Sequence, residues 1–354
     1  MPLPPSSRLW RTDDTLITMP GVASCEAWAG MSAFCMLAAF LFTSAVSAKV
    51  IGLVPMRNEQ PIIEQALRAL TPYVDALIVL DDASIDDSVA IVKRLSTELP
   101  IVEIIENAHS FWEYARESDK RQLMLDRGRA HGGTQFVLLD ADEIFSAVCM
   151  QGDILKNKLC ALLPGQILYV PMIHVWKGLH QFRYDSSRWS PQHCIIGCAF
   201  GDDGRADYRD NPKDSHSGFI HMARIPKNLP DTVAPTFLMD LQYCIIHFRF
   251  ANWHNVLVKR AWYMCLELIR AREVGGSGRT AADINYFYSY HEPFDDTNAL
   301  FKTVDAAWYA YPAFNRDCFV ENVTWRKDQV KQWFARYGKD FFKELAIWDI
   351  DWEE

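Results

Sequence analysis

The segment Phe136-Val-Leu-Leu-Asp-Ala-Asp-Glu143 joins an apolar run directly to three acidic residues. Four consecutive apolar residues are typical of a strand that is buried on both faces in a parallel sheet. Asp140 and Asp142 follow at its carboxyl end, which is the edge where open α/β sheets bind their ligands. Two carboxylates at this spacing suit Mg²⁺ or Mn²⁺ that is also held by substrate phosphates. An isolated Asp-x-Asp also occurs in solvated acidic loops, so the flanking chain decides between the two interpretations.

The composition is that of a globular protein, with 354 residues of which 49% are hydrophobic and 23% are charged. This length allows one large domain or two modest ones. The formal net charge of −9 argues against a nucleic-acid partner, because binding to phosphates requires a basic surface that releases counterions. The nine cysteines include no Cys-x-x-Cys pair. They therefore predict neither a zinc site nor a disulfide framework, and we expect buried free thiols.

The N-terminal 48 residues differ from the rest of the chain. Residues 1–26 are polar, whereas residues 27–48 contain no charged side chain and end in Val46-Ser47-Ala48, which resembles a signal-peptidase site. A cleaved signal, a membrane anchor of about 20 residues and a buried soluble helix are the three interpretations. The first two predict membrane association or the secretory pathway, and the third predicts a cytoplasmic protein. Arg8 and Arg11 lie far upstream of the apolar core, and translation could begin at Met31, so all three stay open.

Strands and helices alternate regularly after Lys49. Apolar runs predict strands at 50–54, 75–80, 101–105 and 136–139, with helices between them that begin near Pro61, Ser84 and residue 111. Ser84, with Asp87 three residues later, is predicted to cap the second of these helices. This alternation predicts βαβ units and a largely parallel sheet.

The alternation stops after Phe145. Further strands are predicted at 167–172, 194–200 and 243–250, followed by a helix at 253–273 and an aromatic-rich remainder. We therefore divide the chain into residues 1–48, a catalytic domain at 49–250 and a helical C-terminal region at 251–354. The aromatic residues form either a hydrophobic core or a platform on which sugar rings stack.

Polar residues follow three of the predicted strands. They are Arg57-Asn58-Glu59, Asp81-Asp82 and the pair Asp140 and Asp142. Because parallel strands end at one edge of a sheet, these side chains should converge there. The sequence contains no G-x-G-x-x-G, G-x-x-x-x-G-K or G-x-S-x-G motif, which argues against a Rossmann cofactor site, a P-loop and a hydrolase elbow.

Taken in order, three segments resemble the motifs of family 2 glycosyltransferases, which have the GT-A fold. The segments are Val54-Pro-Met-Arg-Asn-Glu59, Ile78-Val-Leu-Asp-Asp-Ala-Ser84 and Phe136-Val-Leu-Leu-Asp-Ala-Asp-Glu143. The resemblance extends over residues 49–146. Residues 112–116 and Arg121 also resemble the lipopolysaccharide-core-type members. The resemblance implies an α/β, GT-A-like fold, in which helices flank a mostly parallel central sheet, here followed by the helical, aromatic-rich C-terminal extension.

The resemblance also implies roles for individual residues. Asp140 should lie near the ribose and the metal ion, and Asp142 should coordinate Mn²⁺ or Mg²⁺ directly. The metal would neutralise charge on the departing nucleoside diphosphate. The remaining donor-binding residues are Pro55, Arg57, Asn58, Glu59, Asp81, Asp82 and Arg121.

Other roles are assigned outside the three motifs. Direct displacement with inversion requires a carboxylate base, for which Asp185 and Asp240 are the candidates. His221 and Arg224 are candidates for contact with the acceptor or the diphosphate. His247 alternates with apolar residues in a predicted strand, so it is either a third metal ligand or a core histidine.

The sequence thus predicts a metal-dependent, inverting glycosyltransferase. Its donor would be a nucleotide sugar, with a UDP-sugar expected, and its acceptor a glycan or a lipid-linked molecule. One alternative is a nucleotidyltransferase, which would usually carry a Gly-rich basic loop where this chain has Met56-Arg57-Asn58. The other alternative is a non-catalytic carbohydrate-binding protein on the same scaffold.

Overall fold

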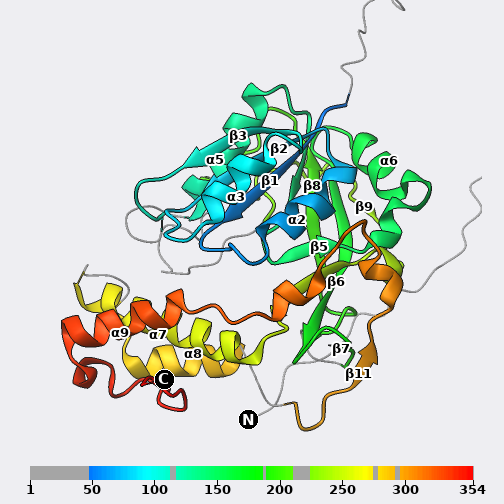
Figure 1. The fold of residues 1–354 in the computed structure, drawn as a ribbon. Helices are drawn as coiled ribbons and strands as arrows, with labels where there is room; N and C mark the ends of the chain where they lie inside the picture. Colours follow the sequence, from blue (N-terminus) through cyan, green and yellow to red (C-terminus); the bar gives the residue numbers. More distant parts are fainter. Residues whose placement is uncertain are drawn as a thin grey trace, which may run out of the picture. The chain divides into compact units, whose positions relative to one another are not determined.

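Four parallel strands form the first half of the central sheet (Figure 1). They are β1 (Val50–Met56), β2 (Ala76–Asp81), β3 (Ile101–Glu106) and β4 (Gln135–Leu138), in the order β3-β2-β1-β4. Every residue of β1, β2 and β4 is buried, as expected for strands covered on both faces. The parallel register places Met56 beside Asp81, so β1 and β2 end together at one edge.

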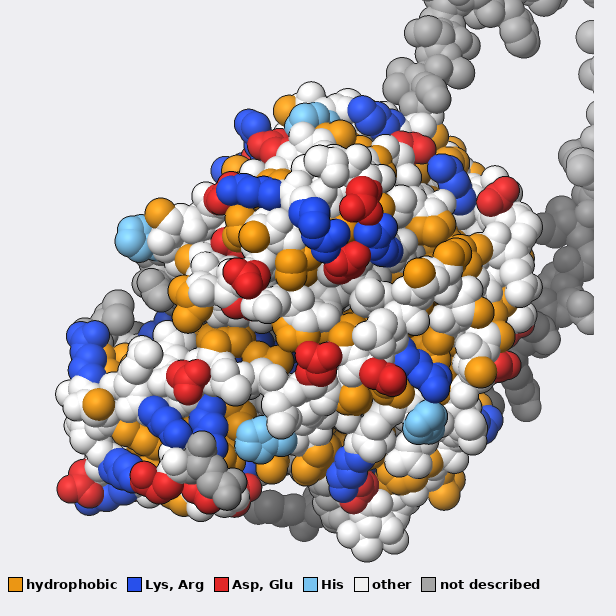
Figure 2. All heavy atoms as spheres, in the orientation of Figure 1, with side chains coloured by type: hydrophobic (Ala, Val, Ile, Leu, Met, Phe, Trp, Pro, Cys, Tyr) orange, Lys and Arg blue, Asp and Glu red, His pale blue; other side chains and the backbone are white. Residues whose placement is uncertain are grey.

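The computed structural model describes residues 48–111, 117–185, 189–209, 224–273, 278–291 and 296–353. Residues 27–47 of the predicted signal or anchor segment, residues 112–116 and His221 lie outside these ranges. Within them, no helix combines the length and the apolar character that a membrane span requires. On the face shown in Figure 2, acidic and basic side chains lie next to one another, in keeping with the net charge of −9.

Helices cover both faces of these four strands. α2 (Ile63–Leu70) and α3 (Ser88–Leu95) pack with Val50 and Val54 of β1 on one face. α5 (Glu117–Ala130) packs with Ile51 of β1 on the other face. α3 begins at Ser88 after Asp87, so the predicted cap at Ser84 is wrong. The Ser84 hydroxyl instead accepts a hydrogen bond from the backbone N–H of Asn58, at 2.8 Å, and joins two loops.

The second half of the sheet is mixed. β8 (Ile195–Gly201) lies antiparallel between β4 and β6 (Ile167–Trp176). β10 (Ile245–Phe250) runs parallel to β6 and antiparallel to β5 (Glu143–Phe145). The short strands are β7 (Gln181–Arg183), β9 (Thr236–Phe237) and β11 (Phe301–Thr303). Together the described residues form an 11-stranded sheet, which confirms the predicted α/β fold class.

Three C-terminal helices share a hydrophobic core of their own (Figure 1). They are α7 (Trp253–Glu273), α8 (Ala281–His291) and α9 (Trp325–Tyr337), and their core includes Trp262 and Phe334. The segment between α8 and α9 returns to the sheet, where Trp308 and Tyr311 join the main core. The predicted domain boundary at residue 250 stays a prediction.

The remaining elements are short. They are α6 (Ile154–Cys160) and the 3-10 helices η1 (Thr71–Tyr73), η2 (Ala147–Asp153), η3 (Leu241–Tyr243), η4 (Ala306–Tyr309), η5 (Arg316–Val320) and η6 (Lys339–Phe342).

Gly201 at the end of β8 provides a test of this packing. A Cβ at this position would overlap with the backbone carbonyl oxygen of Leu163, which cannot rotate away. We expect Gly201→Ala to lower the free energy of unfolding by about 2–3 kcal/mol, measured by chemical denaturation. Gly52→Ala is the control, because its Cβ would meet side-chain carbons and no backbone atom, Leu77 Cδ2 at 2.8 Å and Leu70 Cδ2 at 3.0 Å, and should cost about 1 kcal/mol. Equal losses in the two variants would contradict this account of the β8 packing.

Candidate functional site

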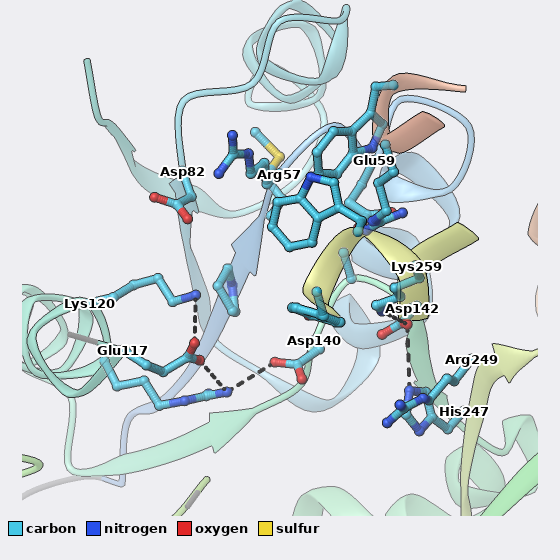
Figure 3. Close-up of a pocket in the computed structure, with 18 of the residues that line it drawn as sticks. Arg57, Glu59, Asp82, Glu117, Lys120, Asp140, Asp142, His247, Arg249 and Lys259 are labelled. Atoms are coloured by element: carbon cyan, nitrogen blue, oxygen red, sulfur yellow. Dashed lines mark hydrogen bonds and ion pairs between the residues drawn. The ribbon is translucent and has the colours of Figure 1, made fainter. Parts of the chain in front are cut away.

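A cavity of about 230 Å³ lies at the carboxyl edge of β1, β2 and β4 (Figure 3). Its floor comes from the loops after these strands, and its far wall comes from β10, α7 and α9. Most of the predicted site residues therefore meet in one place, although the chain separates them by up to 192 positions (247 − 55 = 192). The predicted residues that line the cavity are Pro55, Arg57, Glu59, Asp82, Arg121, Asp140, Asp142, Arg224 and His247.

Asp82 is held rigidly at the end of β2. Its side chain is buried and accepts hydrogen bonds from the Phe111 backbone N–H, at 2.7 Å, and from the Ser110 hydroxyl, at 3.0 Å. Arg57 donates to the same hydroxyl from the loop after β1. The carboxylate is thus fixed between the ends of two strands, with its position set by the backbone after β3.

Asn58 and Asp81 connect loops at the edge of the cavity. Asn58 has a positive φ of 52° and accepts a hydrogen bond from the Ile85 backbone N–H at 2.7 Å. Asp81 accepts one from the Ser84 backbone N–H at 3.1 Å. Neither is among the described residues that line the cavity. Their roles in donor binding stay predictions, and the contacts they make support the loops that carry Arg57 and Asp82.

Asp140 and Asp142 are each surrounded by cations. The carboxylate of Asp140 lies 3.3 Å from Arg121 and 3.8 Å from Arg224. Partial burial would raise the pKa of Asp140, but these guanidinium groups lower it to about 2. Burial opposes ionisation of Asp142 as well, yet Lys259 and His247 hold its pKa well below the usual range. Both carboxylates are therefore ionised at neutral pH, which is the state that a metal ligand requires.

Arg224 forms a buried ion pair beneath the Asp140 loop. Its guanidinium donates to both carboxylate oxygens of Glu143, one of them at 2.6 Å, and to the Leu138 carbonyl at 3.0 Å. Glu143 is 1% exposed, and it also accepts a hydrogen bond from the Asp140 backbone N–H at 3.0 Å. Glu143 is a positioning residue that the sequence analysis missed, although it directly follows the Asp-x-Asp pair.

Asp142 and His247 fit a divalent cation. His247 Nε2 lies 3.5 Å from Asp142 Oδ2, a separation that one ion with ligand bonds of about 2.0–2.2 Å can bridge without backbone movement. Among the described residues, no group of three or more His, Cys, Asp or Glu side chains is placed to hold a metal. An ion here would therefore take its other ligands from water and a substrate, which is how Mg²⁺ commonly binds with phosphates.

His247 lines the cavity, whereas its neighbour across the strands belongs to the core. β10 pairs with β6 so that His247 lies opposite His174, with ring centroids 4.9 Å apart. His174 is 3% exposed and contacts Cys194 Sγ at 3.4 Å. His174 is thus a core histidine, whereas the metal role of His247 stays a prediction.

A cluster on α5 lies beside Asp140 (Figure 3). Glu117, Lys120 and Arg121 are spaced so that they share one helix face, and Glu117 lies 3.4 Å from Lys120 and 3.2 Å from Arg121. Arg121 is almost fully buried and reaches Asp140 across the cavity floor. This placement is compatible with its predicted contact to a nucleotide base or diphosphate.

Most of the far wall of the cavity was not predicted; Trp325 is the exception, as one of the C-terminal aromatic residues for which a sugar platform was one interpretation. The far wall is formed by Arg249 of β10, by Lys259, Trp262 and Tyr263 of α7, and by Trp325 and Arg326 of α9. The spacing of Lys259, Trp262 and Tyr263 places them on one face of α7, and this is the only sequence signal that could have identified them. That spacing gives no indication of where α7 docks.

The remaining candidates lie elsewhere. Asp185 pairs with Arg183 at 2.9 Å, after β7. Asp240 precedes η3 and accepts a hydrogen bond from the Gln242 backbone N–H at 3.1 Å. In the part of the chain that the structure describes, neither carboxylate lines the cavity. The geometry gives no support to either as the general base.

Residues 53–118 match the family model described as glycosyl transferase family 2. This segment contains the first two quoted motifs, and the match confirms the resemblance there, while the lipopolysaccharide-core subgroup stays a prediction. No curated protein matches the chain in sequence.

Three solved structures are similar to parts of this chain. TarS 1–349 of S. aureus is 15% identical, with a TM-score of 0.35, over 71% of this chain and 73% of that chain. Mannosyltransferase PcManGT from Pyrobaculum calidifontis, in complex with GDP-Man and Mn²⁺, is 17% identical, with a TM-score of 0.34, over 63% and 64%. Glucosyl-3-phosphoglycerate synthase from Mycobacterium tuberculosis, in complex with Mg²⁺ and UDP, is 19% identical, with a TM-score of 0.26, over 42% and 49%.

Glu59 should make stability depend on pH. Burial raises its pKa from 4.5 to about 7, against the opposing effect of Arg326. The folded state then holds the proton more tightly, so the free energy of unfolding falls between pH 4.5 and 7 and levels off above 7. Glu59→Gln removes this titration. We therefore expect the free energy of unfolding of the variant, relative to that of wild type, to be about 2 kcal/mol higher at pH 8 than at pH 4.5. One pKa unit corresponds to about 1.4 kcal/mol, and the figure is reduced because the side chain is partly exposed.

Chemical denaturation of both proteins at the two pH values measures this difference. The matched control is Glu64→Gln on α2, which removes ion pairs to Arg68 at 2.9 Å and to Arg94. That variant should not gain stability at pH 8. A Glu59→Gln protein with the same pH dependence as wild type would contradict the assignment.

Proposed function

We propose that the protein is a metal-dependent, inverting glycosyltransferase that transfers a sugar from a nucleoside-diphosphate sugar, with UDP expected as the nucleotide, to a glycan or lipid-linked acceptor. The observation that carries the proposal is that Asp82 follows β2, that Asp140 and Asp142 follow β4, and that all three carboxylates line one cavity. The family match over residues 53–118 supports the same class of enzyme.

The N-terminal side of the cavity suits a nucleoside. Pro55 and Arg57 lie at the end of β1, and the fixed carboxylate of Asp82 lies at the end of β2. A carboxylate whose position is set by buried hydrogen bonds can accept hydrogen bonds from ribose hydroxyls or from a base N–H without reorganising. The same rigidity makes this side selective for a ligand that presents donors at that point.

The floor of the cavity suits a diphosphate. Lys120, Arg121 and Arg224 supply cationic donors next to Asp140, and Asp142 with His247 would hold Mn²⁺ or Mg²⁺. When bound, the metal would supply Lewis-acid neutralisation of the charge that develops on the leaving nucleoside diphosphate. The cationic side chains bind and orient the phosphates, and the buried Arg224–Glu143 pair keeps the Asp140 loop in place.

Glu59 is the best-placed general base among the carboxylates that line the cavity. It lies at the start of the loop into α2, on the side of the cavity nearer to Lys259 and Arg326. A base works best when its pKa is near the operating pH, and burial raises the pKa of Glu59 to about 7. It could therefore take the proton of an acceptor hydroxyl or of water.

A donor screen tests the proposed function. We expect the full-length protein to release nucleoside diphosphate from one sugar nucleotide, with Mn²⁺ present and water as the acceptor. Asp142→Asn should reduce the metal-dependent rate by a factor of about 100 or more, because it removes a charged metal ligand. The control Asp231→Asn changes an exposed carboxylate and should retain the wild-type rate. Full activity in Asp142→Asn, or no release from any sugar nucleotide, would count against the proposal.

The same assay tests Glu59 as the base. Glu59→Gln should lower kcat by a factor of about 10²–10⁴, while nucleotide affinity, measured by calorimetry, should change by less than about threefold. Glu64→Gln, which changes a glutamate in the first turn of α2, should keep the wild-type kcat. An unchanged kcat in Glu59→Gln would remove Glu59 as the base and leave the donor assignment intact.

A further inference from the structure

Three cations form a surface that we call the basic wall: Arg249, Lys259 and Arg326. They come from β10, α7 and α9 and line the main cavity opposite the α5 cluster. Figure 3 shows Lys259 and Arg249 on the side of Asp142 and His247, away from Lys120 and Glu117. The same three side chains line a second cavity of about 60 Å³, together with Glu59 and Asp142. The basic wall therefore lies where the two cavities meet.

The donor's diphosphate has other partners in this arrangement. Arg121 and Arg224 lie next to Asp140, and Lys120 shares the α5 face with Arg121. These groups occupy the floor near the nucleoside side, and the metal-binding pair lies between them and the basic wall. The basic wall is thus a second cationic set, placed beyond the group that would hold the donor's phosphates.

Two members of the basic wall, Lys259 and Arg326, form only long ion pairs with the described carboxylates of the cavity. Lys259 Nζ lies 3.7 Å from Asp142, and Arg326 lies 3.9 Å from Glu59, both longer than a hydrogen bond. By contrast, Arg224 contacts Glu143 at 2.6 Å. Glu59 carries only part of a negative charge at neutral pH, because burial raises its pKa to about 7. A metal ion on Asp142 would use that charge too, so Asp142 and Glu59 would not balance the positive charges of Lys259 and Arg326.

The start of α9 adds donors at the same place. α9 begins at Trp325, and Thr324 before it makes no side-chain cap hydrogen bond with any described residue. The first N–H groups of a helix favour an anion. The Trp325 indole N–H is buried and has no hydrogen-bond partner among the described residues. The guanidinium of Arg326 lies 4.4 Å from the centroid of that ring, and both residues line the main cavity.

We infer that the basic wall binds an anionic group of the acceptor, a phosphate or a carboxylate, so that the acceptor is a negatively charged hydroxyl compound. This inference rests on the proposed function, and it specifies the class of acceptor that the enzyme uses. The aromatic rings of Trp262, Tyr263 and Trp325 on the same side would cover the acceptor's apolar C–H faces. An anion held at Arg326 and Lys259 places a neighbouring hydroxyl of the acceptor beside Glu59.

Binding of inorganic phosphate to the full-length protein tests the inference. The protein is first saturated with Mg²⁺ and with UDP, or with the nucleoside diphosphate that the donor screen identifies. Phosphate is then titrated by calorimetry at constant ionic strength, which keeps screening equal. We expect saturable binding to this complex. Arg326→Gln and Lys259→Gln should each weaken phosphate binding at least tenfold, while nucleotide affinity changes less than threefold.

Lys331→Gln is the matched control. It removes the same charge from the same helix as Arg326, outside both cavities as the described residues define them, and should leave phosphate binding unchanged. Thermal unfolding of each variant checks that it is folded. If Arg326→Gln does not fold, Lys259→Gln serves as the test.

Three results would overturn the inference. They are no phosphate binding to the wild-type nucleotide complex, equal phosphate affinity in wild type and both variants, and a parallel loss of nucleotide and phosphate affinity. The last result would assign the basic wall to the donor's own diphosphate. In each case the proposed function stands provided that the nucleotide binds, whereas absence of nucleotide binding counts against the proposed function itself.

Discussion

The buried pair of Arg224 and Glu143 is the interaction on which the cavity depends. Glu143 is 1% exposed, so its charge is tolerated only because Arg224 engages both of its oxygens. The same carboxylate accepts the backbone N–H of Asp140, and the guanidinium donates to the Leu138 carbonyl at the end of β4. These bonds prevent the Asp140–Asp142 loop from relaxing away from the sheet. The carboxylates therefore stay at the edge where β1 and β2 also end.

Local charge in the cavity differs from the charge of the whole protein. The chain has a formal net charge of −9, yet seven Lys and Arg side chains and five Asp and Glu side chains line the cavity among the described residues. Composition argues against a nucleic-acid partner because it describes the average surface. It could not reveal a concentrated cationic lining, which arises when α5, β10, α7 and α9 each contribute one or two basic residues. Since these elements lie far apart in sequence, only the folded chain brings their charges together.

The parts of the fold that were predictable have local causes. β1, β2 and β4 are uninterrupted apolar runs, and the backbone of a parallel sheet then dictates that the residues after them share an edge. Ser84 shows where local rules fail: its hydroxyl satisfies the Asn58 N–H of another loop instead of capping α3. The positions of Asp185 and Asp240 in the chain do not reveal where their loops lie. Asp185 follows β7 and Asp240 precedes η3, and neither of these elements ends at the cavity. Arg326 and Lys259 could not be identified, because the docking of α7 and α9 depends on side-chain packing within their shared core.

Some aromatic residues of the C-terminal region are buried in a core and others line the cavity, and their hydrogen bonds differ. Tyr311 is buried in the main core, where its hydroxyl donates to the Phe145 carbonyl at 2.9 Å. Trp262 lines the cavity, but its indole N–H is satisfied by Gln329 at 2.6 Å. The N–H of Trp325 has no such partner among the described residues, although the ring contacts guanidinium groups of Arg57 and Arg326. A buried donor without an acceptor costs about 1–3 kcal/mol, and an acceptor oxygen on a bound ligand would offset that cost. Trp325 therefore differs from Tyr311, whose hydroxyl already has its partner within the fold.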